Sequence, residues 1–202
     1  MVGVVLGAGS SRRLGRPKQT LAFGGRSLLA HVMRDIETSS LDRVVLVLGA
    51  AANDVEPNLD LRRAAIALND AYRAGCASSL LAGLDAAGDC DAIVMLLGDM
   101  PGVTAPVIDA VIESWRAQPT WAAVTSYNDG LGHPFVFSAD SFGTLRGLHG
   151  DKAVWKIVDN EPESRVQRIA IDAPLPLDID TAQDYATVCE SFGIAAHERT
   201  PL

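Results

Sequence analysis

Residues 7–18, near the N-terminus, combine glycines, hydroxyl side chains and basic side chains. Gly7 and Gly9 let the backbone approach a polyanion closely because they carry no Cβ, and neighbouring hydroxyls and amides supply hydrogen-bond donors. Arg12, Arg13 and Lys18 add positive charge. This composition favours a loop that holds the phosphates of a nucleoside triphosphate. An ordinary strand-to-helix turn with solvated arginines is the alternative interpretation.

The loop matches neither of two common nucleotide-binding signatures. No Gly-Lys-Ser or Gly-Lys-Thr closes it, so it is not a Walker A loop. Gly15 falls at the wrong spacing for the dinucleotide fingerprint, and no acidic residue follows at the end of the next strand at the required distance.

An acidic residue, Asp99, comes directly after the apolar run Ala92–Leu97 and Gly98. A parallel sheet presents such a residue to the ligand crevice, and an ionised carboxylate suits Mg²⁺, which takes hard oxygen ligands. Gly98 would allow close approach of the ligand. Alternatively, Asp99 caps the following segment and binds no metal.

A second acidic group lies near the C-terminus, at Asp178 and Asp180. Acids spaced by one residue face the same side of an extended segment, so both can point into one site. Asp180 or Thr181 can instead cap the helix that follows, with Asp184 favourable to its dipole. The two interpretations are compatible, because one acid can cap while the other coordinates.

Polar residues also follow the apolar run Ala64–Leu68. Asn69 carries both a donor and an acceptor for the edge of a base, and Ser78 and Ser79 near a helix start can bond to ribose or phosphate. Their alternative roles are those of a turn residue and of helix N-caps.

Short apolar runs alternate with amphipathic segments along the chain. The expected strands are Val2–Leu6, Val44–Leu48, Ala64–Leu68, Ala92–Leu97 and Ala122–Thr125. The expected helices are Ser27–Thr38, Ser78–Ala87, Ala105–Ala117, Ala139–Leu145, Asp151–Val158 and Thr181–Ser191. Continuous apolar strands are buried on both faces, which predicts a mostly parallel, Rossmann-like sheet in a three-layer αβα sandwich. Ligands are expected at the loops after Leu6, Leu68 and Leu97.

Composition narrows the class of protein. With 202 residues, 48% of them hydrophobic, we expect one domain over residues 1–195 and a flexible tail at 196–202. The net charge of −8 argues against bulk nucleic-acid binding. The three cysteines, with no CxxC pair, support neither a disulfide framework nor structural zinc. No apolar run is long enough for a membrane helix, so we expect a cytoplasmic protein.

Residues Leu6 to Gly15, followed by Pro17 and Lys18, resemble the signature of the MobA-like nucleotidyltransferases, especially the molybdenum cofactor cytidylyltransferases. Matching segments extend in the family's order from Val2 to Tyr185. The resemblance implies a fold of the nucleotide-diphospho-sugar transferase type. It further implies transfer of CMP from CTP to the terminal phosphate of a molybdopterin-type cofactor, with release of pyrophosphate.

The resemblance also implies roles for individual residues. Loop amides would bind the β- and γ-phosphates, Arg13 would steady them, and Lys18 would stabilise charge on the α-phosphate. Asp99 and Asp180 would be the Mg²⁺ ligands, with Asp178 as a neighbour, and the catalytic residues would be Lys18, Arg13 and Asp99. The implied nucleotide-binding residues are Leu6, Gly7, Ala8, Gly9, Ser10, Ser11, Arg12, Arg13, Lys18, Asn69, Ser78, Ser79, Gly98 and Asp99.

The acceptor side would be lined by the Gly-His-Pro segment with His133 and Pro134, and by Lys152. As alternatives, His133 is a hydrogen-bonding residue in a turn before a strand, and Lys152 is a solvated lysine. The finished cofactor would be handed to a molybdoenzyme or its chaperone.

One departure from the family pattern is Gly7, where the cytidylyltransferases usually have alanine and the guanylyl branch places its glycine one residue later. A GTP-using enzyme, or one acting on a sugar or alkyl phosphate, therefore stays open beside the CTP enzyme. Two other classes stay open as well: a reductase of dyes or quinones that uses NAD(P)H, and a non-catalytic nucleotide-binding module.

Overall fold

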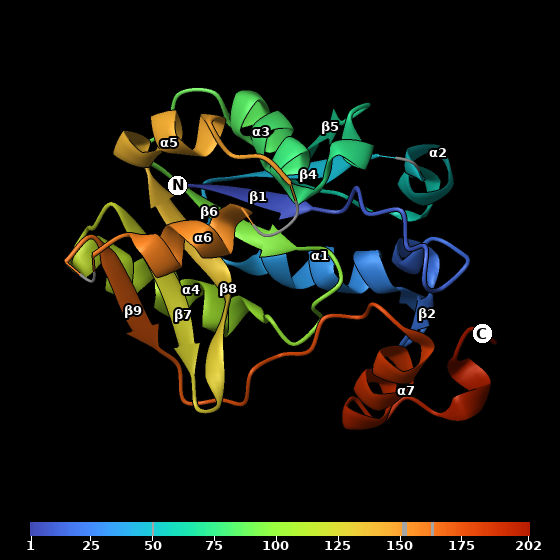
Figure 1. Ribbon diagram of the computed structural model, residues 1–202. Coiled ribbons are helices and arrows are strands. Elements are labelled where there is room, and N and C mark those ends of the chain that lie inside the picture. The colour runs from blue at the N-terminus through green and yellow to red at the C-terminus, as the bar shows by residue number, and fades with distance from the viewer. Residues whose placement is uncertain (50, 151–152, 163) are drawn as a thin grey trace.

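A seven-stranded sheet is the centre of the computed structural model, which describes residues 1–49, 51–150, 153–162 and 164–202 (Figure 1). The strands lie in the order β5-β4-β1-β6-β8-β7-β9, and β8 runs antiparallel to both of its neighbours. The other neighbouring pairs are parallel. The strands are β1 (Val2–Leu6), β4 (Arg43–Leu48), β5 (Ala64–Leu68), β6 (Ala92–Leu97), β7 (Ala122–Tyr127), β8 (Gly130–Ser138) and β9 (Val166–Ala170).

Helices and a small ribbon connect the strands. The ribbon pairs β2 (Ala22–Phe23) with β3 (Arg26–Ser27). The α-helices are α1 (Leu28–Thr38), α2 (Ala52–Val55), α3 (Cys76–Ala87), α4 (Ala105–Ala117), α5 (Phe142–Arg146), α6 (Ala153–Asn160) and α7 (Ala182–Ser191). Short 3-10 turns occupy Lys18–Thr20, Glu56–Asn58, Tyr72–Ala74, Ala139–Ser141 and Ala196–Glu198.

Both faces of the sheet are covered, by α1 and α4 on one side and by α3, α5 and α6 on the other (Figure 1). One apolar core includes Met33 of α1 and Ile112 of α4, and the other includes Leu80 of α3 and Leu145 of α5. Burial on both faces accounts for the unbroken apolar sequences of the inner strands. The predicted three-layer αβα sandwich with a mostly parallel sheet is thus confirmed.

The direction in which the sheet grows reverses at β1. The chain adds β4 and β5 on one side of β1 and then places β6 on the other. Such a switch point opens a crevice at the carboxyl ends of the strands. The loops after β1 and β6 meet there, because the Gly98 N–H donates to the Leu6 carbonyl over 3.0 Å. A Cβ at Gly98 would lie 2.9 Å from Leu29 Cδ1, so a larger residue there would displace the Leu29 side chain.

Several elements differ from the sequence-based expectation. Residues 130–138 form the antiparallel strand β8, although a turn was expected at its start, and β9 was not expected at all. β9 is an edge strand whose exposed residues interrupt its apolar sequence. The helix expected over Ala139–Leu145 is a 3-10 turn followed by the short α5. The expected start of the next helix, residues 151 and 152, lies outside the described residues.

The C-terminal segment lies beside the ribbon (Figure 1). The Ala22 N–H donates to the Thr200 hydroxyl over 2.7 Å, and the Arg199 guanidinium donates to the Ile194 carbonyl. Flexibility of residues 196–202 remains a prediction. Among the residues that the structure describes, no helix combines the length and the hydropathy that a bilayer-spanning segment needs.

Candidate nucleotide-binding site

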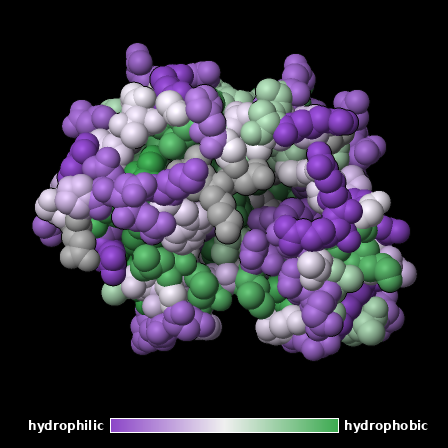
Figure 2. Space-filling view, viewed as in Figure 1, coloured by the Kyte–Doolittle hydropathy of each residue, from purple (hydrophilic) through white to green (hydrophobic). Residues whose placement is uncertain are grey.

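A cavity of about 420 Å³ lies at the switch point, between the loops that follow β1 and β6. Figure 2 shows a hollow near the middle of this face of the molecule, with hydrophilic side chains on its rim. The cavity is lined by Leu6, Gly7, Ala8, Gly9, Ser10, Ser11, Arg12, Arg13, Lys18, Gln19, Tyr72, Arg73, Gly75, Cys76, Ser79, Leu97, Gly98, Asp99 and Asp180. The loops expected after Leu6 and Leu97 therefore contribute most of its wall.

The glycine-rich loop, which we define as residues 7–13, presents unused donors to this cavity. Its first N–H, that of Gly7, donates to the Val47 carbonyl over 2.9 Å. In the described part of the chain, the backbone N–H groups of residues 8–13 donate to no protein atom. Ser11 adopts a positive φ of 50°, and its hydroxyl accepts from the Lys18 N–H over 2.9 Å. This contact closes the loop onto the short helix that carries Lys18.

Four charged side chains meet at one end of the cavity. The Lys18 ammonium forms an ion pair with Asp99 and another, over 2.8 Å, with Asp180. The Arg13 guanidinium lies 3.0 Å from the second oxygen of Asp180. Burial lowers the pKa of Lys18, but the two carboxylates outweigh that effect and hold the pKa above its ordinary value. Burial likewise opposes ionisation of Asp180, yet Lys18 and Arg13 hold the pKa of this carboxyl below its usual range.

Asp99 retains a buried oxygen for a further cation. Its Oδ1 has no hydrogen-bond partner in the described part of the chain, while Lys18 engages Oδ2. Burial raises the pKa of Asp99 above its ordinary value even beside Lys18, so a second cation at Oδ1 would offset the cost of desolvation. The described residues contain no group of three or more His, Cys, Asp or Glu side chains that could hold a metal. Two carboxylates with phosphate oxygens and water nevertheless fit Mg²⁺, which is usually bound in this way.

The open question of the helix cap near Asp180 is answered by the hydrogen bonds of α7. Thr181 is the N-cap, because its hydroxyl accepts from the Asp184 N–H. The Asp184 carboxylate in turn accepts from the N–H groups of Thr181 and Asp180. Asp180 therefore has its side chain available for Lys18 and the cavity. Asp178 is exposed and does not line the cavity.

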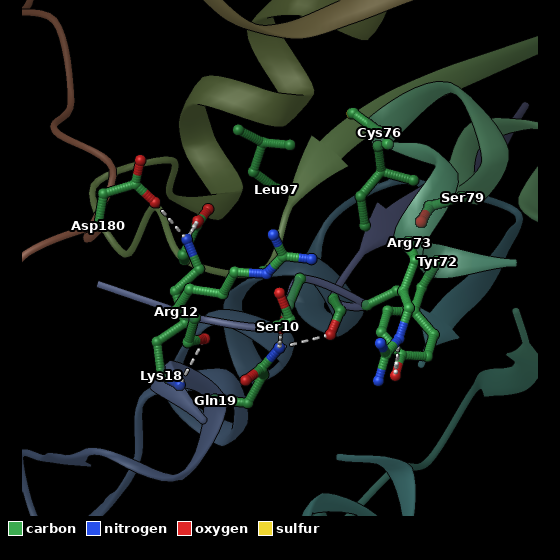
Figure 3. Close-up of a pocket in the computed structure, with 18 of the residues that line it drawn as sticks. Ser10, Arg12, Lys18, Gln19, Tyr72, Arg73, Cys76, Ser79, Leu97 and Asp180 are labelled. Carbon is green, nitrogen blue, oxygen red and sulfur yellow. Dashed lines mark hydrogen bonds and ion pairs between the residues drawn. The ribbon is translucent and has the colours of Figure 1, made fainter. Parts of the chain in front are cut away.

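The two arginines of the loop differ in their surroundings. Arg13 is paired with Asp180 and its side chain is 70% exposed. Arg12 extends into the cavity in Figure 3, and in the described part of the chain it forms no ion pair. Within the described part of the chain, Arg12 is therefore the loop arginine that no carboxylate engages. The sequence analysis had placed both arginines at the nucleotide and expected Arg13 to steady the phosphates.

Asn69 occupies the expected place after β5, but its amide bonds within the protein. The side chain is 5% exposed, its Nδ2 donates to the hydroxyls of Ser78 and Ser79 over 3.0 Å each, and its Oδ1 accepts from the Ala71 N–H. Ser78 in turn donates to backbone carbonyls, and only Ser79 of these three lines the cavity. The structure thus places Asn69 and Ser78 behind the cavity wall, where they hold the turn before α3.

His133 lies inside β8, so its expected place in a turn is wrong. It is 7% exposed, and its ring packs edge-on against Phe135 with centroids 4.7 Å apart. Burial lowers the pKa of His133 to about 4. Neither His133 nor Pro134 lines the cavity, and Lys152 lies outside the described residues.

Several cavity residues were not named individually in the sequence analysis, although the loop after Leu68 was expected to face a ligand. Tyr72 and Arg73 belong to the short helix before α3, and the Arg73 Nε donates to the Tyr72 hydroxyl over 3.1 Å. Gln19 directly follows Lys18 and lies beneath the glycine-rich loop (Figure 3). Proximity to the predicted loops would have identified these residues as candidates, but not the direction of their side chains.

Comparisons with known proteins agree with this geometry. The family model of the MobA-like NTP transferase domain matches residues 3–166. Over 145 residues, the chain is 34% identical to nicotine blue oxidoreductase of Paenarthrobacter nicotinovorans, covering 69% of this chain and 71% of that protein.

Two solved structures are also similar. One is the homologue of Mycobacterium tuberculosis rv0371c from Mycobacterium sp. strain JC1, with 38% identity, a TM-score of 0.84, and coverage of 94% of this chain and 95% of that one. Another is Rv0371c of M. tuberculosis H37Rv in complex with manganese, with 36% identity, a TM-score of 0.79, and coverage of 94% and 98%. The chain belongs to the MobA-like NTP transferase family, and it is an enzyme of the nucleotidyltransferase type.

Proposed function

We propose that this protein transfers CMP from CTP to the terminal phosphate of a molybdopterin-type cofactor and releases pyrophosphate. The observation that carries the proposal is the junction of three features at one cavity. These are a loop with unused backbone N–H groups, a buried lysine, and two carboxylates on separate loops. The preference for CTP rests on the resemblance of the Gly-His-Pro and Asp-Ile-Asp segments to the cytidylyltransferase branch.

In the proposed reaction, the loop amides and Arg12 hold the β- and γ-phosphates of the nucleotide. Lys18 stays protonated between two carboxylates and stabilises the charge that develops on the α-phosphate. The acceptor phosphate is already an anion, so it needs no general base, and catalysis consists of positioning two polyanions. Asp99 and Asp180 would hold Mg²⁺, which would neutralise charge on the α-phosphate and on the leaving pyrophosphate. The manganese in the complex of a 36% identical relative supports use of a divalent metal.

The test is pyrophosphate release with CTP, GTP, ATP or UTP, each with Mg²⁺ and a molybdopterin-type acceptor. Release with CTP supports the proposal, preference for GTP moves the assignment to the guanylyl branch, and no release with any of the four contradicts it. Asp99→Asn should abolish release while CTP binding persists, because the amide keeps the shape of the side chain but loses its charge. Asp140→Asn is the matched control, since Asp140 is exposed and follows β8 at the opposite end of β6 from Asp99. If Asp99→Asn retains turnover, the metal assignment is wrong.

A second candidate is an NAD(P)H-dependent reductase, which the name of the 34% identical relative favours. A cavity that accepts a triphosphate could also take the pyrophosphate of a dinucleotide. This function predicts a fall in absorbance at 340 nm, as NAD(P)H is oxidised with a dye or quinone, in the absence of any nucleoside triphosphate. A wild-type protein that releases pyrophosphate but oxidises neither NADH nor NADPH would exclude it.

A further inference from the structure

Gln19 is a buried amide directly beneath the glycine-rich loop. It lies in the short helix Lys18–Thr20, is 3% exposed and lines the cavity. Its Nε2 donates to the carbonyls of Gly7 over 2.7 Å and of Gly9 over 3.0 Å (Figure 3). Both N–H groups of the amide are therefore directed at the loop backbone.

These two contacts set the direction of two further N–H groups. The peptide bonds of the loop are trans, and in a trans peptide the carbonyl of one residue and the N–H of the next point in opposite directions. A Gly7 carbonyl held toward Gln19 therefore turns the Ala8 N–H away from Gln19. The Gly9 carbonyl does the same for the Ser10 N–H. Ala8 and Ser10 both line the cavity, and neither N–H donates to an atom of the described residues.

Without such a contact, these peptide units would rotate easily. Glycine has a wider range of backbone dihedrals than other residues, and both carbonyls that Gln19 binds belong to glycines. A flipped unit would turn a carbonyl oxygen toward the phosphates, where its partial negative charge repels them. Among uncharged side chains, only glutamine and asparagine carry two N–H donors on one nitrogen, and asparagine is one methylene group shorter.

We propose that Gln19 is a positioning residue that holds the peptide units 7–8 and 9–10 with their N–H groups facing the phosphate chain of the nucleotide. The inference rests on the proposed nucleotide binding, and it identifies Ala8 and Ser10 as the donors. It assigns Gln19 no contact with the reacting atoms.

The test compares Gln19→Met with a matched control, Gln167→Met. Methionine retains the length of the side chain and removes both donors. Gln19 and Gln167 share a buried Oε1 without a hydrogen-bond partner in the described part of the chain, but Gln167 lies in β9 at the far edge of the sheet. Calorimetry would measure the dissociation constants of CTP, inorganic tripolyphosphate and cytidine, each with Mg²⁺. Thermal unfolding would check the fold of both variants.

We expect Gln19→Met to weaken CTP and tripolyphosphate about tenfold or more, since hydrogen bonds to charged groups are lost. Cytidine should change less than twofold, and Gln167→Met should bind all three probes like the wild type. Unchanged binding of CTP by Gln19→Met overturns this inference but leaves the proposed function standing. An equal loss for cytidine also overturns it, because the role would then not concern the phosphates. Wild-type protein that binds neither CTP nor tripolyphosphate overturns the proposed function together with the inference.

If Gln19→Met does not fold, the wild-type protein decides the question. Tripolyphosphate with Mg²⁺ should then shift the backbone amide resonances of Ala8 and Ser10 more than those of the other loop residues. Large shifts confined to other amides would overturn the inference.

Discussion

Acidification should destabilise the protein through His133. The ring is buried and neutral, with Nδ1 3.5 Å from the Met95 carbonyl, and burial lowers its pKa to about 4 from 6.5. Below pH 6.5 the unfolded chain takes up a proton at this residue and the folded protein does not, so stability falls as the pH falls. Each pH unit costs up to about 1.36 kcal/mol.

Between pH 6.5 and pH 5, these values predict a loss of about 2 kcal/mol from His133 alone. The loss would reach about 3 kcal/mol near pH 4 and would level off at lower pH. Urea unfolding at closely spaced pH values measures the free energy of unfolding. His133→Asn is the reference, because its amide can replace the Nδ1 donor but does not titrate. We expect the difference between the two proteins to change by about 2 kcal/mol over this range.

Equal pH dependence of the wild type and His133→Asn would refute this reasoning. An independent check is the His133 ring resonance in proton NMR, which should not titrate above pH 5. The same variant tests the acceptor-side role implied by family resemblance. Because His133 is buried in β8 and does not line the cavity, we expect His133→Asn at pH 7 to leave the KM for the acceptor unchanged. A large rise in that KM would restore the role in acceptor binding.

Three further substitutions test other parts of the structure. Arg12→Ala should weaken CTP binding about tenfold in calorimetry, and more than Arg13→Ala does, because among the described residues no carboxylate pairs with Arg12 whereas Asp180 pairs with Arg13. A larger loss for Arg13→Ala would reverse the assignment. Thr181→Ala should cost about 1 kcal/mol in urea unfolding, since it removes the N-cap of α7, and an unchanged midpoint would contradict the capping box. Gly83→Ala should cost about 1 to 3 kcal/mol despite the better helix propensity of alanine, because its Cβ would lie 2.3 Å from Val4 Cγ1. A stabilised Gly83→Ala protein would show that α3 can move away from β1.

Much of the fold could be predicted because short runs of neighbouring residues indicate the buried strands and the helices between them. Apolar runs such as Ala92–Leu97 are continuous where strands are buried on both faces, and their alternation with helical patterns indicates a parallel sheet. The start of β8 and the whole of β9 were not predicted, because their pattern is less regular. β8 pairs antiparallel with β6, and β9 is an edge strand, so neither follows the pattern of a buried parallel strand.

Asn69 and His133 illustrate why residue type alone misassigned parts of the site. Both are polar residues close to predicted loops, and both can serve as donors to a ligand. In the structure, the Asn69 amide N–H groups donate to the hydroxyls of Ser78 and Ser79. His133 lies in β8, and its ring packs in the core beside Phe135. The hydrogen-bond partners of Asn69 and His133 depend on the packing of α3 and on the register of β8. The local sequence pattern predicts neither of these.

The sequence by itself determined the glycine-rich loop with its cations, the acid after β6 and the acid before α7. The reason is that the backbone freedom of glycine, the charge of a side chain and a position after a strand can each be recognised from neighbouring residues. Only the tertiary structure decided that Lys18 joins Asp99 to Asp180, that Gln19 supports the loop from below, and that Arg13, unlike Arg12, pairs with Asp180 at the cavity. The physical reason is that these pairings join residues up to 162 positions apart, and side-chain direction follows from packing around the sheet rather than from spacing.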